Sequence, residues 1–512
     1  MTQRPEHGYT YFMRRRDFFS LPLLGFPASG QSGGVTRAGF AETDITPEIG
    51  MEQPGGYGKV FHKSLHDPCK VRAAVFDDGR KTAALVGIDA LMIPRKLVLE
   101  ARALIQSRCG IAGDAVMIGA SHSHSSGPTG MIQPGEFDGS PAFVRKLAYE
   151  RSSCADARYL ELCTRRIVEA VEKAWRGRRE LKLGAGLGHE DRAAFNRRHR
   201  MKNGLTYTHP RYGNPDMLDY AGPIDPQVGV IAAWDEKGKL VGCVVNYTCH
   251  ATTSPGGISA NWIYYLEKTI RGAMEADAVV VFLQGASGDI TQVNNKSPHQ
   301  APGGDQSARL VGGRVGAEAV KVMLSMTSGT LVPVQSSSTL LKIPRRKPAP
   351  EKLKKAMELA ARDPGSADPT EWTFAKETVL LDDIIRREPV ADVEVQAIQV
   401  GPVVYVSNPA EYFCQFGLDI KKGSPFPITS VVELANGCVG YVPTEEALGP
   451  GGGGYETRLT AYSNLEPAAG RKIANAGIAL ARKFKPGLFP VPGPAPAFRE
   501  AWTYGSVPPE VK

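Results

Sequence analysis

Short apolar runs rich in β-branched residues alternate along this chain with longer segments of helical periodicity, and this alternation constrains the fold most strongly. The predicted strands are residues 71–76, 82–87, 115–119, 228–233, 240–247, 278–283, 393–400 and 403–406. The predicted helices are residues 96–107, 159–175, 262–275 and 314–326. Strands that alternate with helices of this length pack in layers, because each sheet needs an apolar cover. The sequence therefore predicts a mixed, layered α/β fold with β-sheets flanked by helices.

The two ends of the chain differ in composition from the region between them. Residues 14–26 place three arginines before a short apolar run, a pattern that resembles a twin-arginine export signal. We therefore expect an export signal and leader at 1–34 and a periplasmic or extracellular protein; a basic leader without an export role is the alternative. One folded domain is expected at 35–485, with a charged surface insertion at about 343–380. Residues 486–512 are predicted to form a Pro-rich tail.

The formal net charge of +8 is spread along the chain rather than gathered in one basic motif. Because no aromatic residues interleave with the basic runs, we predict no nucleic-acid partner. No protein partner is predicted either, whereas peripheral contact with an anionic membrane stays open. No apolar stretch reaches the length of about 18 residues that a membrane-spanning helix requires. The eight cysteines show no Cys-x-x-Cys spacing, which argues against a structural zinc knuckle.

Four predicted strands end directly in residues that can bind a metal ion. These are His122 and His124 after 115–119, His250 after 244–247, Asp289 after 280–283 and Glu411 after 403–406. In extended backbone His122 and His124 would point to the same side, where both could bind one metal ion or one could transfer protons. A lone His-x-His pair is more often structural. Three of only ten histidines follow strands here, however, and this concentration favours a metal site at the strand ends.

The segment Ala-Ser-His-Ser-His-Ser-Ser-Gly-Pro at residues 120–128 closely resembles the His-Thr-His-Ser-Gly-Pro signature of the neutral/alkaline, non-lysosomal ceramidases. The resemblance continues in the expected order through Asp-Ile-Thr-Pro at 44–47, His-Asp-Pro at 66–68 and Asp-Asp-Gly at 77–79 to Tyr-Glu at 455–456. It implies the fold of the family's catalytic domain, without the family's C-terminal immunoglobulin-like domain. It also implies a hydrolase that cleaves the amide bond of ceramide or a related lipid amide with a metal-activated water.

The resemblance also implies one catalytic zinc ion and the residues that hold it. Matched motif by motif, these residues are His122, His250, Glu411 in Pro-Ala-Glu-Tyr at 409–412, and Tyr441 in Gly-Tyr-Val-Pro-Thr at 440–444. Nitrogen and oxygen ligands of this kind suit Zn²⁺. From the residues alone, Glu411 would be a loop carboxylate and Tyr441 a core aromatic residue.

Three further residues match the reaction centre of the family. The resemblance implies that His124 acts as the general acid or base, that Arg197 faces the carbonyl oxygen or the polar head of the substrate, and that Tyr455 donates a hydrogen bond to the developing oxyanion. Arg197 would otherwise be a surface residue of a basic run. The glycines at 451–454 are interpreted as a mobile loop that delivers Tyr455.

The chain departs from the family pattern beside the expected substrate site. The serine of the family's Gly-Asp-Val/Leu-Ser-Pro-Asn segment is Thr291 here, and residues 259–262 also differ. Two alternatives to ceramide hydrolysis therefore stay open. One is a zinc-dependent amidase or esterase that acts on a non-sphingolipid substrate, and the other is a secreted lipid-binding protein that has lost catalysis.

Overall fold

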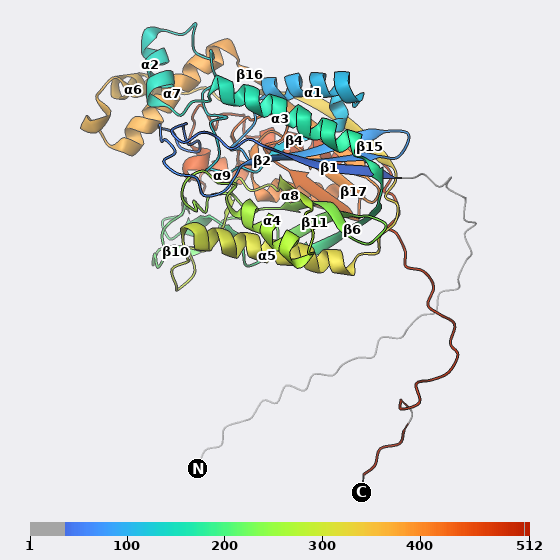
Figure 1. Cartoon of the computed structure of the whole chain (residues 1–512). Coiled ribbons are helices and arrows are strands. Elements are labelled where there is room, and N and C mark those ends of the chain that lie inside the picture. Colours follow the sequence, from blue (N-terminus) through green and yellow to red (C-terminus); the bar gives the residue numbers. More distant parts are fainter. Residues whose placement is uncertain (1–35, 506, 512) are drawn as a thin grey trace, which may run out of the picture. The chain divides into compact units, whose positions relative to one another are not determined.

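The computed structural model describes residues 36–505 and 507–511, and the export signal predicted at 1–34 lies outside these residues. Two β-sheets stacked face to face form the centre of the domain (Figure 1). The first sheet has the strand order β4–β3–β2–β1–β5. Its strands are β1 (Arg37–Asp44), β2 (Lys70–Asp77), β3 (Thr82–Ile88), β4 (Val116–Ala120) and β5 (Arg179–Glu180).

The second sheet has the strand order β13–β12–β11–β6 and lies against strands β2, β3 and β4 of the first sheet. Its strands are β6 (Lys182–His189), β11 (Gln227–Trp234), β12 (Leu240–Tyr247) and β13 (Val279–Gln284). A third sheet, β15–β16–β17–β19, contacts the second through β19. It consists of β15 (Val334–Pro344), β16 (Val390–Val400), β17 (Val403–Ser407) and β19 (Ile428–Val432).

Helices cover the outer faces of the sheets (Figure 1). Helices α1 (Arg95–Cys109) and α3 (Ala157–Arg176) lie over the first sheet, α4 (Trp262–Ala273) and α5 (Gly304–Ser325) over the second, and α8 (Cys414–Gly423) and α10 (Ala469–Ala481) over the third. The remaining helices are α2 (Ala142–Arg151), α6 (Pro350–Ala360), α7 (Pro369–Arg387) and α9 (Glu445–Leu448), with 3-10 turns at Gly113–Ala115, Pro364–Ser366 and Tyr455–Thr457. The predicted mixed, layered α/β fold is confirmed.

Short strands build the region beside the sheet ends. They are β7 (Phe195–Asn196) paired with β14 (Ile290–Thr291), the sheet of β8 (Arg198–Met201), β9 (Thr206–Thr208) and β10 (Met217–Tyr220), and β18 (Glu411–Tyr412) paired with β20 (Tyr441–Val442). Among the described residues no helix is both long enough and apolar enough to span a bilayer. The eight cysteines are all free thiols there.

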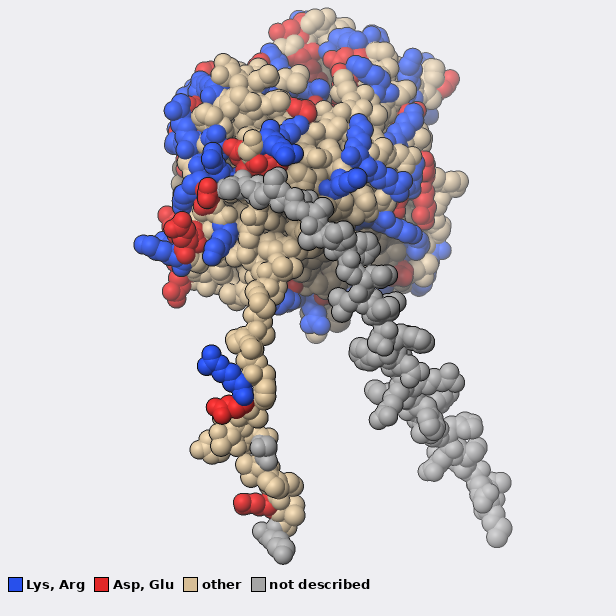
Figure 2. Space-filling model, turned by 90° about the vertical axis from the view of Figure 1, so that its right-hand side faces the viewer, with Lys and Arg blue, Asp and Glu red and all other residues tan. Residues whose placement is uncertain are grey.

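The charge of the surface is mixed. On the face that Figure 2 displays, basic side chains of the described residues are interspersed with acidic ones. Regular structure ends at α10, and residues 486–505 form neither helix nor strand. The amide of Gly487 donates to the carbonyl of Gly401 at 3.0 Å. Farther along, Phe498 and Trp502 are largely exposed.

The close approach of the two central sheets depends on a missing side chain at Gly87 in β3. A Cβ atom at this position would lie 2.3 Å from the carbonyl oxygen of Phe282 in β13. We expect Gly87→Ala to lower the free energy of unfolding by about 1–3 kcal/mol, because the added methyl group overpacks the interface between the sheets. Urea denaturation measures the change. Gly272→Ala is the matched control, since its Cβ would meet no atom within 4 Å; equal unfolding midpoints for the two variants would contradict the packing described here.

Candidate metal centre and active site

The loops that follow β4, β12, β13 and β17 meet at one edge of the stacked sheets. β3 and β4 run parallel, as do β12 and β13, so the carboxyl ends of neighbouring strands lie together. The amide of His124 donates to the carbonyl of Ala251 at 3.1 Å, which joins the loop after β4 to the loop after β12. The pairing of Glu411 with Tyr441 between β18 and β20 adds the third side of the site.

Two histidines and one carboxylate converge at this edge. His122, His250 and Glu411 are buried to 1%, 1% and 2% exposure. The Oε2 atom of Glu411 lies 3.3 Å from Nε2 of His122 and 3.1 Å from Nε2 of His250. His124 is half-buried, and its Nε2 lies 3.2 Å from Nε2 of His122. The three imidazoles place ring nitrogens within 4.8 Å of one another, a spacing that a single metal ion could bridge.

Backbone carbonyls fix how the two buried rings present their nitrogens. Nδ1 of His122 donates to the carbonyl of Leu91 at 2.8 Å, and Nδ1 of His250 donates to the carbonyl of Ser287 at 2.6 Å. A neutral imidazole with its proton on Nδ1 carries a lone pair on Nε2. Both lone pairs therefore face Glu411, whose Oε2 accepts no hydrogen bond from any described residue. Two imidazole nitrogens and one carboxylate oxygen that converge in a buried position are a donor set that fits a bound cation.

The surrounding charges set the ionisation of these groups. Burial raises the pKa of Glu411, but His122 and His250 outweigh it and hold that pKa well below its ordinary value. Burial and the charge of Arg197 lower the pKa of His250 to about 3, so this ring is neutral at pH 7. Burial has the largest single effect on the pKa of His122 and lowers it, but the Glu411 carboxylate together with the Leu91 carbonyl and Glu433 raises that pKa above its ordinary value. The site thus holds one carboxylate charge beside neutral or proton-sharing imidazoles.

Arg197 is a buried residue of the site and not part of an exposed basic run. Its side chain is 3% exposed, and its Nε donates to Oε1 of Glu456 at 2.8 Å. One terminal nitrogen donates to the carbonyl of Gly288 at 2.7 Å and to the hydroxyl of Tyr441 at 3.2 Å. The hydroxyl of Tyr455 lies 3.3 Å from that of Tyr441. Burial raises the pKa of Tyr455 to about 12, so both phenols stay protonated and can donate hydrogen bonds.

A cavity of about 170 Å³ opens onto these groups. It is lined by Gly55, Gly56, Tyr57, Leu91, His122, His124, Met131, Glu411, Tyr441, Tyr455 and Tyr462. Gly55 has φ of 108° and lies against His124, since a Cβ there would be 2.3 Å from the imidazole Nδ1. Of the seven residues predicted for the site, this wall contains five, and Arg197 and His250 contact it from behind.

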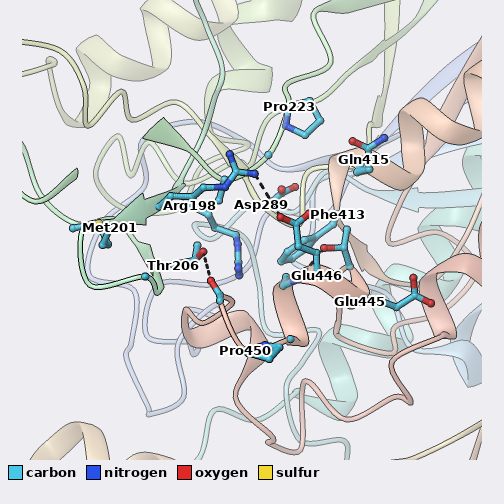
Figure 3. A pocket seen from close by; sticks show the side chains of 18 of the residues that line it. Arg198, Met201, Thr206, Pro223, Asp289, Phe413, Gln415, Glu445, Glu446 and Pro450 are labelled. Atoms are coloured by element: carbon cyan, nitrogen blue, oxygen red, sulfur yellow. Dashed lines mark hydrogen bonds and ion pairs between the residues drawn. The ribbon is translucent and has the colours of Figure 1, made fainter. Parts of the chain in front are cut away.

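A larger cavity of about 600 Å³ is lined in part by Arg198 (Figure 3). Its lining includes Thr206, Asp289 and Pro450 but no histidine of the described chain. The two carboxylate oxygens of Asp289 already accept hydrogen bonds, from the amide of Cys414 and from the side chain of Asn196, both at 2.8 Å. Because its acidic groups are paired or exposed, this cavity is not a second candidate metal site.

Local backbone structure differs from the prediction at two positions. His122 has φ of 61°, so the segment after β4 is not the extended strand assumed for the His-x-His pair. The left-handed residue still brings the imidazoles of His122 and His124 together, and strain of this kind is common at functional sites. The glycine loop before Tyr455 is hydrogen-bonded to β9, since the amide and hydroxyl of Thr206 donate to Gly452 and Gly451 at 3.0 Å.

Other residues take places that the sequence motifs alone do not reveal. Thr291 pairs with Phe195 between β14 and β7 and does not line the small cavity. Glu456 is fully buried and joins Arg197 to Thr208, whose hydroxyl donates to it at 2.6 Å. The only sequence signal for Glu456 was its position next to Tyr455.

Taken together, the strand ends, the converging lone pairs and the adjoining phenols define a candidate mononuclear metal centre in a layered α/β protein. No protein-family model matches this chain. The neutral ceramidase of Pseudomonas aeruginosa is 25% identical over 305 residues, which are 56% of this chain and 42% of that protein. The match therefore spans less than half the length of this curated relative.

Two solved structures share the fold. One is described as a ceramidase complexed with C2, with a TM-score of 0.63 and 18% identity over 90% of this chain and 78% of that one. The other is the neutral ceramidase from Pseudomonas aeruginosa, with a TM-score of 0.63 and 20% identity over 91% of this chain and 77% of that one. The sequence match and the shared fold confirm the resemblance to the neutral ceramidase family.

The converging lone pairs lead to a prediction about metal binding. We expect His250→Ala to leave the chain folded but to lower its affinity for Zn²⁺ by more than about 100-fold, because losing a ligand costs more than losing a supporting hydrogen bond. Metal content after dialysis and titration calorimetry measure this change. His209→Ala is the control, since that half-buried histidine contacts Asn295 and lies outside the ligand group. A His250→Ala protein with full metal content would refute the assignment.

Proposed function

We propose that this chain is a zinc-dependent amidohydrolase that cleaves the amide bond of ceramide or a related lipid amide. The observation that carries the proposal is the convergence of the His122 and His250 Nε2 lone pairs on the unpartnered Oε2 of Glu411. Tyr441 is the strand partner of Glu411 between β18 and β20, and it is the fourth candidate ligand. The names of the similar proteins support the choice of substrate.

The chain's own groups supply the rest of the chemistry. A bound zinc ion would act as a Lewis acid and lower the pKa of a water molecule. Nε2 of His124, at the cavity wall, would take a proton from the attacking water and return it to the leaving amine. The hydroxyl of Tyr455 would donate to the carbonyl oxygen as negative charge develops there. Arg197 would stabilise that charge through its fixed position 3.2 Å from the Tyr441 hydroxyl.

The size of the cavity favours a second candidate, a zinc-dependent amidase or esterase that acts on a short acyl group. The volume of about 170 Å³ is below the range of about 300–1,000 Å³ that is typical of ligand pockets. The cavity can hold the scissile bond and its nearest substituents, and a long acyl chain would have to extend out of it. Substrates that differ only in acyl length separate the two candidates.

Export is part of the proposal. We infer that the basic and apolar residues 14–26 direct the chain to the periplasm or the exterior, where it would meet lipid at a membrane surface. Expression in a bacterium with and without a functional twin-arginine transporter, followed by fractionation, tests this inference. Loss of export only in the strain without the transporter is the expected result.

The central test uses a fluorescent ceramide as substrate. We expect cleavage by the purified chain, loss of cleavage after chelation, and recovery when Zn²⁺ is added back, because the site binds a single essential ion. Fluorescent amides with acyl chains of two and of many carbons are compared under the same conditions. Cleavage of the short amide alone would support the second candidate. Bound zinc with no cleavage of any amide or ester would contradict an enzymatic function.

The proposed oxyanion donor can be tested separately from the metal. Tyr455→Phe removes one hydroxyl and keeps the ring, so we expect kcat to fall by about 10²–10³-fold while KM and zinc content stay near the wild-type values. Steady-state kinetics and metal analysis provide both readouts. Tyr462→Phe is the matched control, since this phenol lines the same cavity but contacts Cys438. Equal kcat values for the two variants would remove Tyr455 from the mechanism.

A further inference from the structure

Helix α7 carries a fully buried lysine that is hydrogen-bonded to two distant segments. The side chain of Lys376 is 1% exposed. Its ammonium group donates to the carbonyl of Tyr57 at 2.6 Å, to the carbonyl of Arg151 at 3.1 Å and to the hydroxyl of Ser152 at 2.8 Å. The carboxylate of Glu377, also buried, lies 3.1 Å away. All three donors are therefore used, as a buried charge requires.

One of these acceptors belongs to the wall of the candidate active site. Tyr57 and the glycines before it line the small cavity, and Gly55 lies against His124. The same helix also holds the ring of Tyr57, since the ring of Phe374 packs on it edge to face at 5.8 Å. Helix α7 thus fixes both the backbone and the side chain of this part of the wall.

The helix also contacts the segment that carries Tyr455, a second residue of the cavity lining. The guanidinium of Arg458 stacks on the ring of Phe374 at 3.6 Å and pairs with Glu371 at 3.2 Å. Arg458 directly follows the 3-10 turn of Tyr455, and its amide donates to the carbonyl of Tyr455 at 3.2 Å. Tyr57 and Tyr455, which both line the cavity, are therefore carried by segments that α7 holds in place.

We propose that α7 positions the mouth of the candidate active site, with Lys376 as the positioning residue that holds the loop of residues 55–57 over His124. Lys376 does not touch the cavity itself, so it acts through Tyr57. Holding this loop in one conformation lowers the entropy lost when a substrate is bound. If the loop of residues 55–57 were released, substrate binding would weaken more than the rate of the chemical step would fall. The kinetic part of this inference depends on the proposed amidohydrolase function, and the structural part does not.

The structural part is tested by cleavage with chymotrypsin at the peptide bond after Tyr57. In Lys376→Met we expect this cleavage to accelerate about fivefold or more, because local opening of the loop becomes easier. Cleavage after Phe498 and Trp502 provides an internal standard, since these tail residues are 83% and 76% exposed. Lys354→Met, at an exposed position of α6, is the matched control and should cleave at the wild-type rate.

Because removal of Lys376 leaves Glu377 buried without its partner, Phe374→Leu serves as a second variant. It releases the ring of Tyr57 without burying a charge, and we expect accelerated cleavage in the same bond. Thermal unfolding of each variant shows whether the chain is folded at the temperature of the assay. Unchanged cleavage after Tyr57 in both folded variants would overturn the proposal.

The kinetic part uses the fluorescent amide that the wild-type chain cleaves best. We expect Lys376→Met to raise KM about tenfold with kcat within about threefold, and zinc content to stay unchanged. A fall in kcat as large as the rise in KM would indicate a purely structural lysine and contradict the proposal. A rise in KM that occurs only in variants with lowered stability would contradict it as well. If the wild-type chain cleaves no amide, the proposed function fails, whereas the chymotrypsin result still decides the role of Lys376.

Discussion

The arrangement on which the site depends is the placement of Nε2 of His122 and Nε2 of His250 at 3.3 Å and 3.1 Å from Oε2 of Glu411, a distance at which their lone pairs face one another. Such groups repel one another unless a cation lies between them, so the scaffold must hold them. It does so with hydrogen bonds from Nδ1 to backbone carbonyls and with strand ends that the sheets fix in place. A metal ion bound there would offset this cost and stabilise the folded state, since it binds the assembled ligands only.

The buried ion pair of Arg197 and Glu456 shapes the electrostatics around this centre. Arg197 lies 3.3 Å from Nε2 of His250 and helps to lower the pKa of that ring to about 3, which keeps it a neutral donor of a lone pair. Glu456 balances the charge of Arg197 and also contacts Arg198, which lines the larger cavity. Arg197 is therefore a source of positive charge beside the phenol rings of Tyr441 and Tyr455. Removing either partner would leave an unpaired buried charge.

The strands that could be predicted from the sequence are those whose own residues form an apolar run. All eight predicted strands are present, because their apolar runs are buried in the layered core. Strand β6 was missed because Gly184, Gly186 and Gly188 give it low strand propensity, yet this bare face lets α5 pack closely, with a Cβ at Gly186 only 2.8 Å from Val322. The candidate ligands came from family motifs, and the structure brings them together. The Tyr-Glu motif at 455–456 contains Glu456 but does not reveal its role, and no motif contains Lys376, because both roles arise from contacts between segments far apart in the sequence.

On the proposed function, the chemical step and the selection of the substrate depend on different parts of this fold. The candidate ligands lie at strand ends inside the sheets, whereas the mouth of the cavity is formed by residues 55–57 and the turn at Tyr455, both supported by α7. On the proposed function, a substitution in α7 would therefore alter which acyl group fits without moving a candidate metal ligand. On the proposed function, the cavity of about 170 Å³ limits the buried part of a substrate to the region around the scissile bond. On the proposed function, the acyl preference of this chain would depend on α7 and the loop that it holds, because surface segments vary more than the fold that supports the candidate metal centre.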